Sequence, residues 1–149
     1  MSVKFLFLTK QFYSDFISCP EIEQKPDRPH VRILVRVENI DFAVPMRSHI
    51  NHPNAYLTDK VNKCGVDYSK AIVITDAQRY VETARQPRIR QNEFDALRGK
   101  EYILEQGMRK YLKAYVKALE KPEIPRNAML LKYSTLQYFH EYILPVKDE

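Results

Sequence analysis

The sequence predicts a single α+β domain over residues 1–149. From 31 to 37, apolar residues alternate with two arginines and a leucine, which is the two-residue period of a strand with one solvent-exposed face. From 101 to 120, apolar residues recur every three or four positions, as in an amphipathic helix. Strands come first and helices mostly afterwards, without repeats or linkers, and this order favours an α+β fold.

The N-terminal part predicts a short strand and a short helix. Residues 3–9 (VKFLFLT) have the composition of a strand. The side-chain oxygen of Thr9 is placed to accept a hydrogen bond from the first turn of a helix that ends near Phe16. Three prolines in the next polar stretch predict a loop before the strand at 31–37.

The strand at 31–37 is expected to continue into an antiparallel partner. Its solvent-exposed face would carry Arg32 and Arg36, and the residues ENID would turn the chain into a strand at 42–46 (FAVPM). Pro45 in that second strand has no N–H to donate to a neighbouring strand. It therefore marks an edge, a bulge or the end of the strand.

The second half of the chain predicts one more strand and three helices. Residues 70–76 (KAIVITD) form the strand, after a turn-like segment at 64–69 (CGVDYS). A short helix is expected to end at Gly99, and two prolines end the long helix at 101–120. The last helix, at 133–144, begins with a serine cap.

The charge of the chain favours an anionic partner. The net charge is +5 and the pI is about 9.1, and Lys or Arg side chains that neutralise phosphates gain affinity by releasing counterions. A solvated basic surface without a partner is an equal alternative on charge alone. The distribution favours a binding patch, because the segment 85–100 contains only two acids and five basic residues: Arg85, Arg88, Arg90, Arg98 and Lys100.

The sequence also predicts a cytoplasmic protein. Its first residues lack the basic and then apolar pattern of a secretory leader, and no stretch approaches the roughly 20 apolar residues that span a bilayer. Cys19 and Cys64 have neither the spacing of a zinc site nor the setting of a disulfide scaffold, so we expect reduced thiols.

Candidate catalytic residues lie in the loop after the strand at 42–46. Arg47, Ser48, His49 and His52 fall within six positions of one another. Histidine can give or take a proton near neutral pH, arginine offers a planar fork to phosphate, and serine can hydrogen-bond to it. RNA supplies its own nucleophile in the 2′-hydroxyl group. The cluster therefore predicts RNA cleavage with no metal and no cofactor.

Other chemistries have less support in the sequence. The patterns GxSxG, GxxxxGK[ST] and HExxH are all missing. A metal site built on His49 and His52 would lack a nearby third ligand. Taken singly, each loop residue is more simply a turn cap, a surface histidine or an ion-pair partner. A non-catalytic RNA-binding module and a metal-dependent nuclease remain the alternatives to metal-independent cleavage.

Four segments resemble the TenpN toxins of type III toxin–antitoxin systems, which are relatives of the ToxN, CptN and AbiQ endoribonucleases. The segments are FAVPMRSHINHPNAYLTD, CGVDYSKAIVI, PRIRQNEFDALRGKEYI and residues 131–144. The resemblance covers nearly the whole chain. It implies a compact, strongly twisted antiparallel β-sheet flanked by helices, similar to the toxin fold of Kid and MazF.

The resemblance also implies an activity and its partners. The toxins it points to cut RNA without a metal and leave 2′,3′-cyclic phosphate and 5′-hydroxyl ends. Each is inhibited by a small repeated RNA pseudoknot, which the toxin trims from a precursor and which closes with it into a toxin–RNA assembly. The implied partners are this antitoxin RNA and cellular mRNA, with neither DNA nor a membrane. The implied role is growth arrest and phage defence by abortive infection.

Site residues can be carried over at only some positions. In the ToxN branch, a Ser and a Lys of the loop after this strand serve the site. Ser48 matches the Ser, whereas Ile50 falls where the Lys would be. The role of the lysine then falls to Arg47, His49, His52 or Lys70. The candidate RNA-binding residues are Arg28, which matches a basic residue that contributes in that branch, and Arg32, Tyr56, Arg85, Arg88, Arg90 and Lys100.

Overall fold

The computed structural model describes residues 3–22 and 30–144 as a six-stranded antiparallel sheet with helices around it, which confirms the α+β class. The strands run in the order β1-β2-β3-β5-β4, and β6 also pairs with β3. The strands are β1 (Phe5–Leu6), β2 (Arg32–Val37), β3 (Ile40–Arg47), β4 (Ala55–Asp59), β5 (Cys64–Asp67) and β6 (Ile72–Val73). The sheet is open, because the described strands do not close into a barrel.

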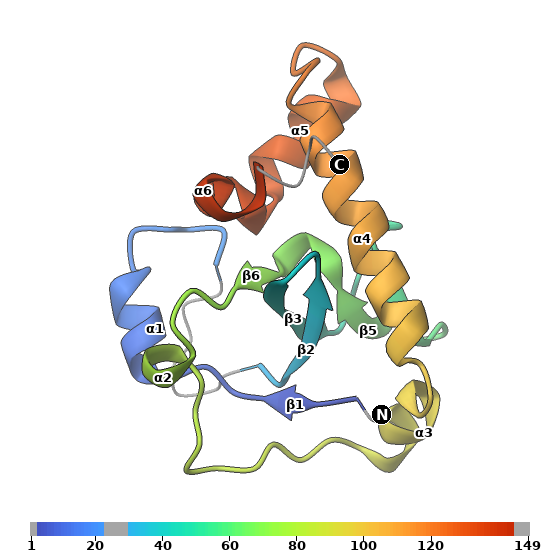
Figure 1. Cartoon of the computed structure of the whole chain (residues 1–149). Helices are drawn as coiled ribbons and strands as arrows, with labels where there is room; N and C mark the ends of the chain where they lie inside the picture. Colours follow the sequence, from blue (N-terminus) through green and yellow to red (C-terminus); the bar gives the residue numbers. More distant parts are fainter. Residues whose placement is uncertain (1–2, 23–29, 145–149) are drawn as a thin grey trace.

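Six α-helices and two short 3-10 helices complete the described part of the chain. They are α1 (Lys10–Asp15), η1 (Tyr68–Lys70), α2 (Ala77–Tyr80), α3 (Gln91–Leu97), α4 (Glu101–Ala118), α5 (Pro125–Tyr133), η2 (Thr135–Tyr138) and α6 (His140–Ile143). Figure 1 shows α1 and α2 side by side at one end of the sheet and the long helix α4 along the other. Helix α5 and the C-terminal end of α4 extend beyond the sheet.

The two predicted helix signals that depend on local sequence are confirmed. Thr9 caps α1, because its hydroxyl oxygen accepts a hydrogen bond from the N–H of Phe12 at 3.2 Å. Helix α4 buries the predicted apolar stripe against the sheet, and β2 is the strand it contacts most. The buried side chains of this stripe are Leu104, Met108, Tyr111, Leu112 and Tyr115.

The hairpin of β2 and β3 forms the centre of the sheet and carries the candidate loop at its end. Glu38 and Asn39 make a two-residue turn with φ values of 50° and 66°. Positive φ at both central residues gives the turn a twist that matches the twist of the strands. This turn fixes the register, in which Val37 pairs with Ile40 and Arg32 pairs with Pro45.

Strand β3 changes its partner near Pro45. On the side away from β2, Phe42 and Ala43 pair with β6, whereas Met46 and Arg47 pair with β5. The N–H of Met46 donates to the carbonyl oxygen of Val31, just before β2, so the nitrogen of Pro45 faces the opposite side, where the two partner strands meet. A residue without an N–H fits this position because no strand there requires its donor.

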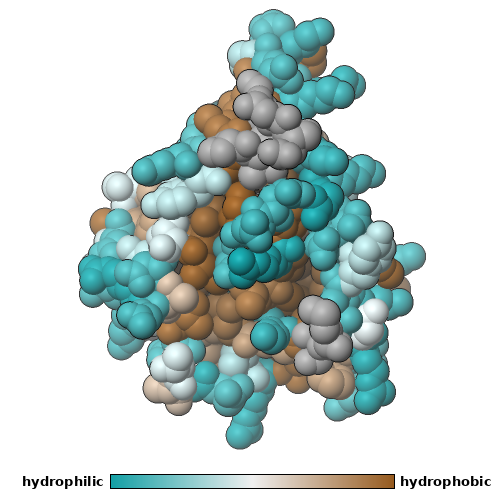
Figure 2. Space-filling view, in the orientation of Figure 1, coloured by the Kyte–Doolittle hydropathy of each residue, from teal (hydrophilic) through white to brown (hydrophobic). Residues whose placement is uncertain are grey.

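The apolar core lies between this sheet and the helices. Figure 2 shows that, on the face seen in Figure 1, apolar residues gather in a hollow over the sheet between α1 and α4, with hydrophilic residues around it. Within the described ranges, no helix combines the length and the apolar composition that crossing a bilayer requires.

Several sequence predictions were wrong about local structure. The turn-like segment 64–69 contains strand β5, and β4 lies in a stretch for which the sequence predicts no strand. Lys70 belongs to η1 and not to a strand. Pro125 begins α5, which suits its fixed φ and missing N–H, and the predicted last helix at 133–144 is divided into η2 and α6.

The prediction that Arg32 faces solvent was also wrong. Its side chain is fully buried, with 1 % of the residue exposed, although Arg36 on the same face is exposed. Nη1 of Arg32 donates to the carbonyl oxygens of Ala43 at 3.2 Å and Lys70 at 3.4 Å. The chain around η1 therefore covers the end of this face of the sheet, and the two-residue alternation of β2 does not reveal such a cover.

Candidate active site around Arg47

Arg47 is the last residue of β3, and a buried carboxylate holds its side chain in place. Nη1 of Arg47 donates to Oδ2 of Asp67 at 3.0 Å. Asp67 ends β5, and only 1 % of its side chain is exposed, compared with 32 % for Arg47. Because β3 and β5 are paired at this point, the sheet fixes both partners of the ion pair.

Asp67 is also the cap of η1. Its Oδ1 accepts hydrogen bonds from the backbone N–H of Ser69 at 2.9 Å and from the Ser69 hydroxyl at 2.6 Å. Burial favours the neutral acid, but hydrogen bonds from His52 and Ser69 and the charges of His52 and Arg47 outweigh it and hold the pKa of Asp67 below its usual range. The carboxylate is therefore ionised at neutral pH and orients the Arg47 guanidinium.

The structure separates the two histidines of the predicted loop. Nε2 of His52 lies 3.1 Å from Oδ1 of Asp67 and 3.2 Å from the hydroxyl oxygen of Ser69. Its Nδ1 accepts a hydrogen bond from the N–H of Asn54 at 3.1 Å, which assigns the proton of the neutral ring to Nε2. Both ring nitrogens of His52 are therefore used to hold the loop against Asp67.

His49, by contrast, is exposed beside Ser48. Its Nδ1 lies 3.2 Å from the Ser48 hydroxyl oxygen. The backbone of His49 is in the left-handed region, with φ of 57°. This conformation turns the chain sharply after β3 and places the imidazole on the surface next to the end of the strand.

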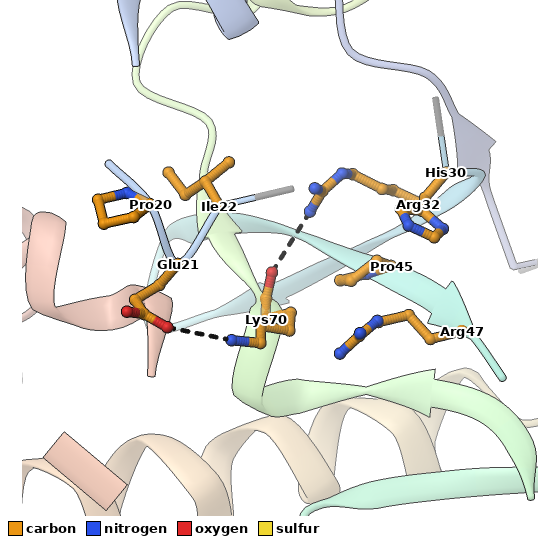
Figure 3. Close-up of a pocket in the computed structure, with 8 residues that line it drawn as sticks. All are labelled: Pro20, Glu21, Ile22, His30, Arg32, Pro45, Arg47 and Lys70. Carbon is orange, nitrogen blue, oxygen red and sulfur yellow. Dashed lines mark hydrogen bonds and ion pairs between the residues drawn. The ribbon is translucent and has the colours of Figure 1, made fainter. Parts of the chain in front are cut away.

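A first pocket lies on one side of Arg47, and we refer to it as the Lys70 pocket (Figure 3). Its volume is about 310 Å³. Nζ of Lys70 donates to the carbonyl oxygen of Tyr133 at 2.9 Å and lies 3.7 Å from Oε2 of Glu21. The lining residues are Pro20, Glu21, Ile22, His30, Arg32, Pro45, Arg47 and Lys70.

A second pocket also has Arg47 in its lining, and we refer to it as the Arg88 pocket. Its volume is about 300 Å³. Ser48 lines it, together with two arginines of the basic segment predicted from the sequence. The full lining is His30, Val31, Met46, Arg47, Ser48, Cys64, Arg88, Ile89, Arg90 and Glu93. His30 and Arg47 line both pockets, so the two pockets adjoin at these residues.

The remaining predicted residues lie elsewhere. Tyr56 reaches toward the carbonyl oxygen of Ala96, with 3.5 Å between the two oxygens. Arg85 stacks over the ring of Phe7, and Lys100 precedes the first turn of α4. These three predicted residues line neither pocket. Arg28 lies outside the residues that the structure describes.

Sequence reasoning missed three residues of the site: His30, Asp67 and Ser69. Asp is a preferred residue at the start of a helical turn, where its side chain accepts a hydrogen bond from the backbone N–H two residues on, and Asp67 stands in such a position. No local pattern marked His30, which lies two residues before β2 and lines both pockets. Among the described residues, no group of three or more His, Cys, Asp or Glu could hold a metal ion.

The arrangement concentrates positive charge around one fixed guanidinium. Two pockets with basic linings meet at Arg47, beside a serine hydroxyl and an exposed imidazole. Such a surface can bind phosphate groups and stabilise the charge of a phosphoryl transition state.

Comparisons with known family models, curated proteins and solved structures found no match to the chain.

Proposed function

We propose that this protein is a metal-independent endoribonuclease of the TenpN-like toxin kind, with a fold related to Kid and MazF. The observation that carries the proposal is the position of Arg47. A buried carboxylate orients its guanidinium, Arg47 lines two pockets that contribute further cations, and Ser48 lines one of them. The open antiparallel sheet and the resemblance of the loop sequence support the same reading.

In the proposed reaction the 2′-hydroxyl of RNA attacks the adjacent phosphorus. The hydroxyl loses its proton to a base, the bond from phosphorus to the 5′-oxygen breaks, and an acid protonates that oxygen. The products are a 2′,3′-cyclic phosphate and a 5′-hydroxyl. Arg47 stabilises the charge on the phosphoryl oxygens, and the Ser48 hydroxyl hydrogen-bonds to one of them.

The candidate proton carriers are His30 and His49. His30 lines both pockets, and His49 is exposed beside Ser48. The proposal gives His52 a positioning role, since both of its ring nitrogens already contact Asp67, Ser69 or Asn54. Histidine suits acid and base roles because its ordinary pKa lies near neutrality.

The proposal extends to partners and location. A repeated pseudoknot RNA would inhibit the enzyme and be trimmed by it, and cellular mRNA would be its substrate in the cytoplasm, causing growth arrest during phage infection. The net charge of +5 supports an RNA partner. The two basic pockets support contact with the phosphate backbone.

The test is cleavage of a mixed-sequence RNA by purified protein in the presence of EDTA. We expect cyclic phosphate and 5′-hydroxyl ends, and resistance of a substrate with 2′-deoxyribose at the cleaved position. Arg47→Ala, Ser48→Ala and His49→Asn should each reduce cleavage and relieve growth inhibition, whereas Lys113→Ala, on the exposed face of α4, serves as the control for lost positive charge. A 5′-phosphate product, or cleavage that EDTA abolishes and magnesium restores, would contradict the mechanism.

A non-catalytic RNA-binding protein is the second candidate. One observation favours it: among the described residues, His30 is the only histidine that lines either pocket. His52 is turned toward Asp67 instead. Wild-type protein that binds RNA in a gel-shift assay but produces no new ends after prolonged incubation would support this candidate over the nuclease.

A further inference from the structure

The two pockets have separate cations and a shared wall. Lys70 belongs to one pocket and Arg88 to the other, whereas Arg47 and His30 belong to both. Each pocket also contains one acid among its described lining residues, Glu21 in the first and Glu93 in the second. The internal partners of these cations determine whether each pocket can hold an anion independently of the other.

In the Lys70 pocket, the internal partners of the lysine leave room for an anion. Nζ of Lys70 has three hydrogens to donate, and one of them goes to the carbonyl oxygen of Tyr133. The Glu21 carboxylate is 3.7 Å away, which is longer than a hydrogen bond, and Figure 3 shows it facing Lys70 across the pocket. A phosphate oxygen can approach the ammonium group without breaking a short contact.

In the Arg88 pocket, the arginines have weak internal partners. Arg88 is exposed and forms no hydrogen bond or ion pair within the part of the chain that the structure describes. Nε of Arg90 lies 4.0 Å from Oε1 of Glu93, and 75 % of the Arg90 side chain is exposed. An ion pair this long and this exposed contributes little, so a phosphate can replace it at low cost.

We propose that the site binds two successive phosphates of one RNA strand, one in each pocket, with the intervening nucleoside over Arg47. This inference rests on the proposed function and specifies its substrate as a nucleotide that carries phosphates on both its 3′- and 5′-oxygens. Two pockets that share a wall match neighbouring phosphates of one strand. Arg47 lines both pockets, and its guanidinium can donate to a bound phosphate, since it carries five N–H donors in a planar fork.

Binding of deoxythymidine 3′,5′-bisphosphate tests the proposal without cleavage, because this probe has no 2′-hydroxyl. Calorimetry at low salt should show that wild-type protein binds the bisphosphate about tenfold or more tightly than deoxythymidine 3′-monophosphate or 5′-monophosphate, the effect of one added charged contact. Lys70→Gln and Arg88→Gln should each remove most of this advantage. Lys113→Gln, which removes one positive charge from the exposed face of α4 outside both pockets, should preserve it.

The outcomes separate this inference from the proposed function. Equal affinity for the bisphosphate and both monophosphates, or an advantage that only one of the two pocket variants reduces, would overturn the two-phosphate site even if the protein cleaves RNA. A bisphosphate advantage that both variants remove would support the site, even if the absence of RNA cleavage overturned the nuclease proposal. Circular dichroism spectra of both variants should match wild type, since Lys70 and Arg88 lie outside the apolar core.

Discussion

Replacing Asp67 by Asn is the sharpest test of how the site is held together. The substitution keeps the size of the side chain and removes its charge. Arg47 and His52 then lose a charged acceptor, and the buried amide has two donor hydrogens where the carboxylate had only lone pairs. Hydrogen bonds to charged groups contribute about 1.5–3 kcal/mol, and removing one partner of a buried ion pair costs about 3–5 kcal/mol.

The exposure of Arg47 lowers the expected cost. About a third of its side chain is in contact with solvent, so water can replace part of what the carboxylate provides. We expect Asp67→Asn to lower the free energy of unfolding by about 2–3 kcal/mol, and the melting temperature by roughly 4–12 °C for a chain of this size. Urea and thermal unfolding at pH 7 measure both quantities.

The stability that the Asp67 carboxylate contributes should decrease in acid. The pKa of Asp67 is lowered in the folded protein, so its contribution to stability is present above the pKa of the unfolded chain, about 3.9, and is lost as the pH falls through the folded pKa. The stability difference between wild type and Asp67→Asn should therefore be present at pH 7 and shrink in acid below the pKa of the unfolded chain.

A matched control exists in the same sheet. Asp41 also pairs with an arginine, Arg36, at 3.3 Å, but both side chains are exposed. Asp41→Asn should therefore lower the free energy of unfolding by less than about 1 kcal/mol. Equal stability of Asp67→Asn and wild type, or a difference that persists unchanged below pH 3, would refute the assignment of Asp67 as the ionised anchor of Arg47.

Three further predictions concern the fold and the basic segment. Thr9→Ala should lower the free energy of unfolding by about 1 kcal/mol in a urea titration, because α1 loses its N-cap; an unchanged midpoint would contradict the cap. Gly65→Ala should cost about 3 kcal/mol or more, or prevent folding, because the added Cβ would lie 2.2 Å from the backbone oxygen of Tyr56; near-native stability would be incompatible with this strand pairing. Arg88→Gln should reduce the slope of log affinity for RNA against log salt by about one at most, and Arg85→Gln should leave it unchanged; the reverse order would place the RNA elsewhere.

Local periodicity predicted the elements whose burial follows a simple pattern. Strand β2, helix α4 and the Thr9 cap were all visible in the sequence, because each depends on residues within one or two turns or pleats. Strand β5 was not, because its four residues are all buried and include Gly65 and Asp67, two types that are uncommon in strands. Gly65 is required there by the close approach of the β4 backbone, which only the folded chain reveals.

The site was predicted only in part for a similar reason. Arg47 and Ser48 were identified because they are neighbours in a short loop. Asp67 lies 20 positions from Arg47, and the pairing of β3 with β5 brings the two together. His49 and His52 are close in sequence, yet the left-handed turn at His49 sends one ring to the surface and leaves the other against Asp67. Contacts between distant strands decided which predicted residues meet.

The left-handed backbone at His49 determines how its side chain should be removed in an experiment. Alanine has no polar side chain to support a positive φ, so His49→Ala would combine the loss of the imidazole with conformational strain. Glycine adopts φ near 57° without steric penalty, although it makes the unfolded chain more flexible. Comparing His49→Gly with His49→Asn, which also tolerates this region, separates the chemistry of the imidazole from the shape of the loop.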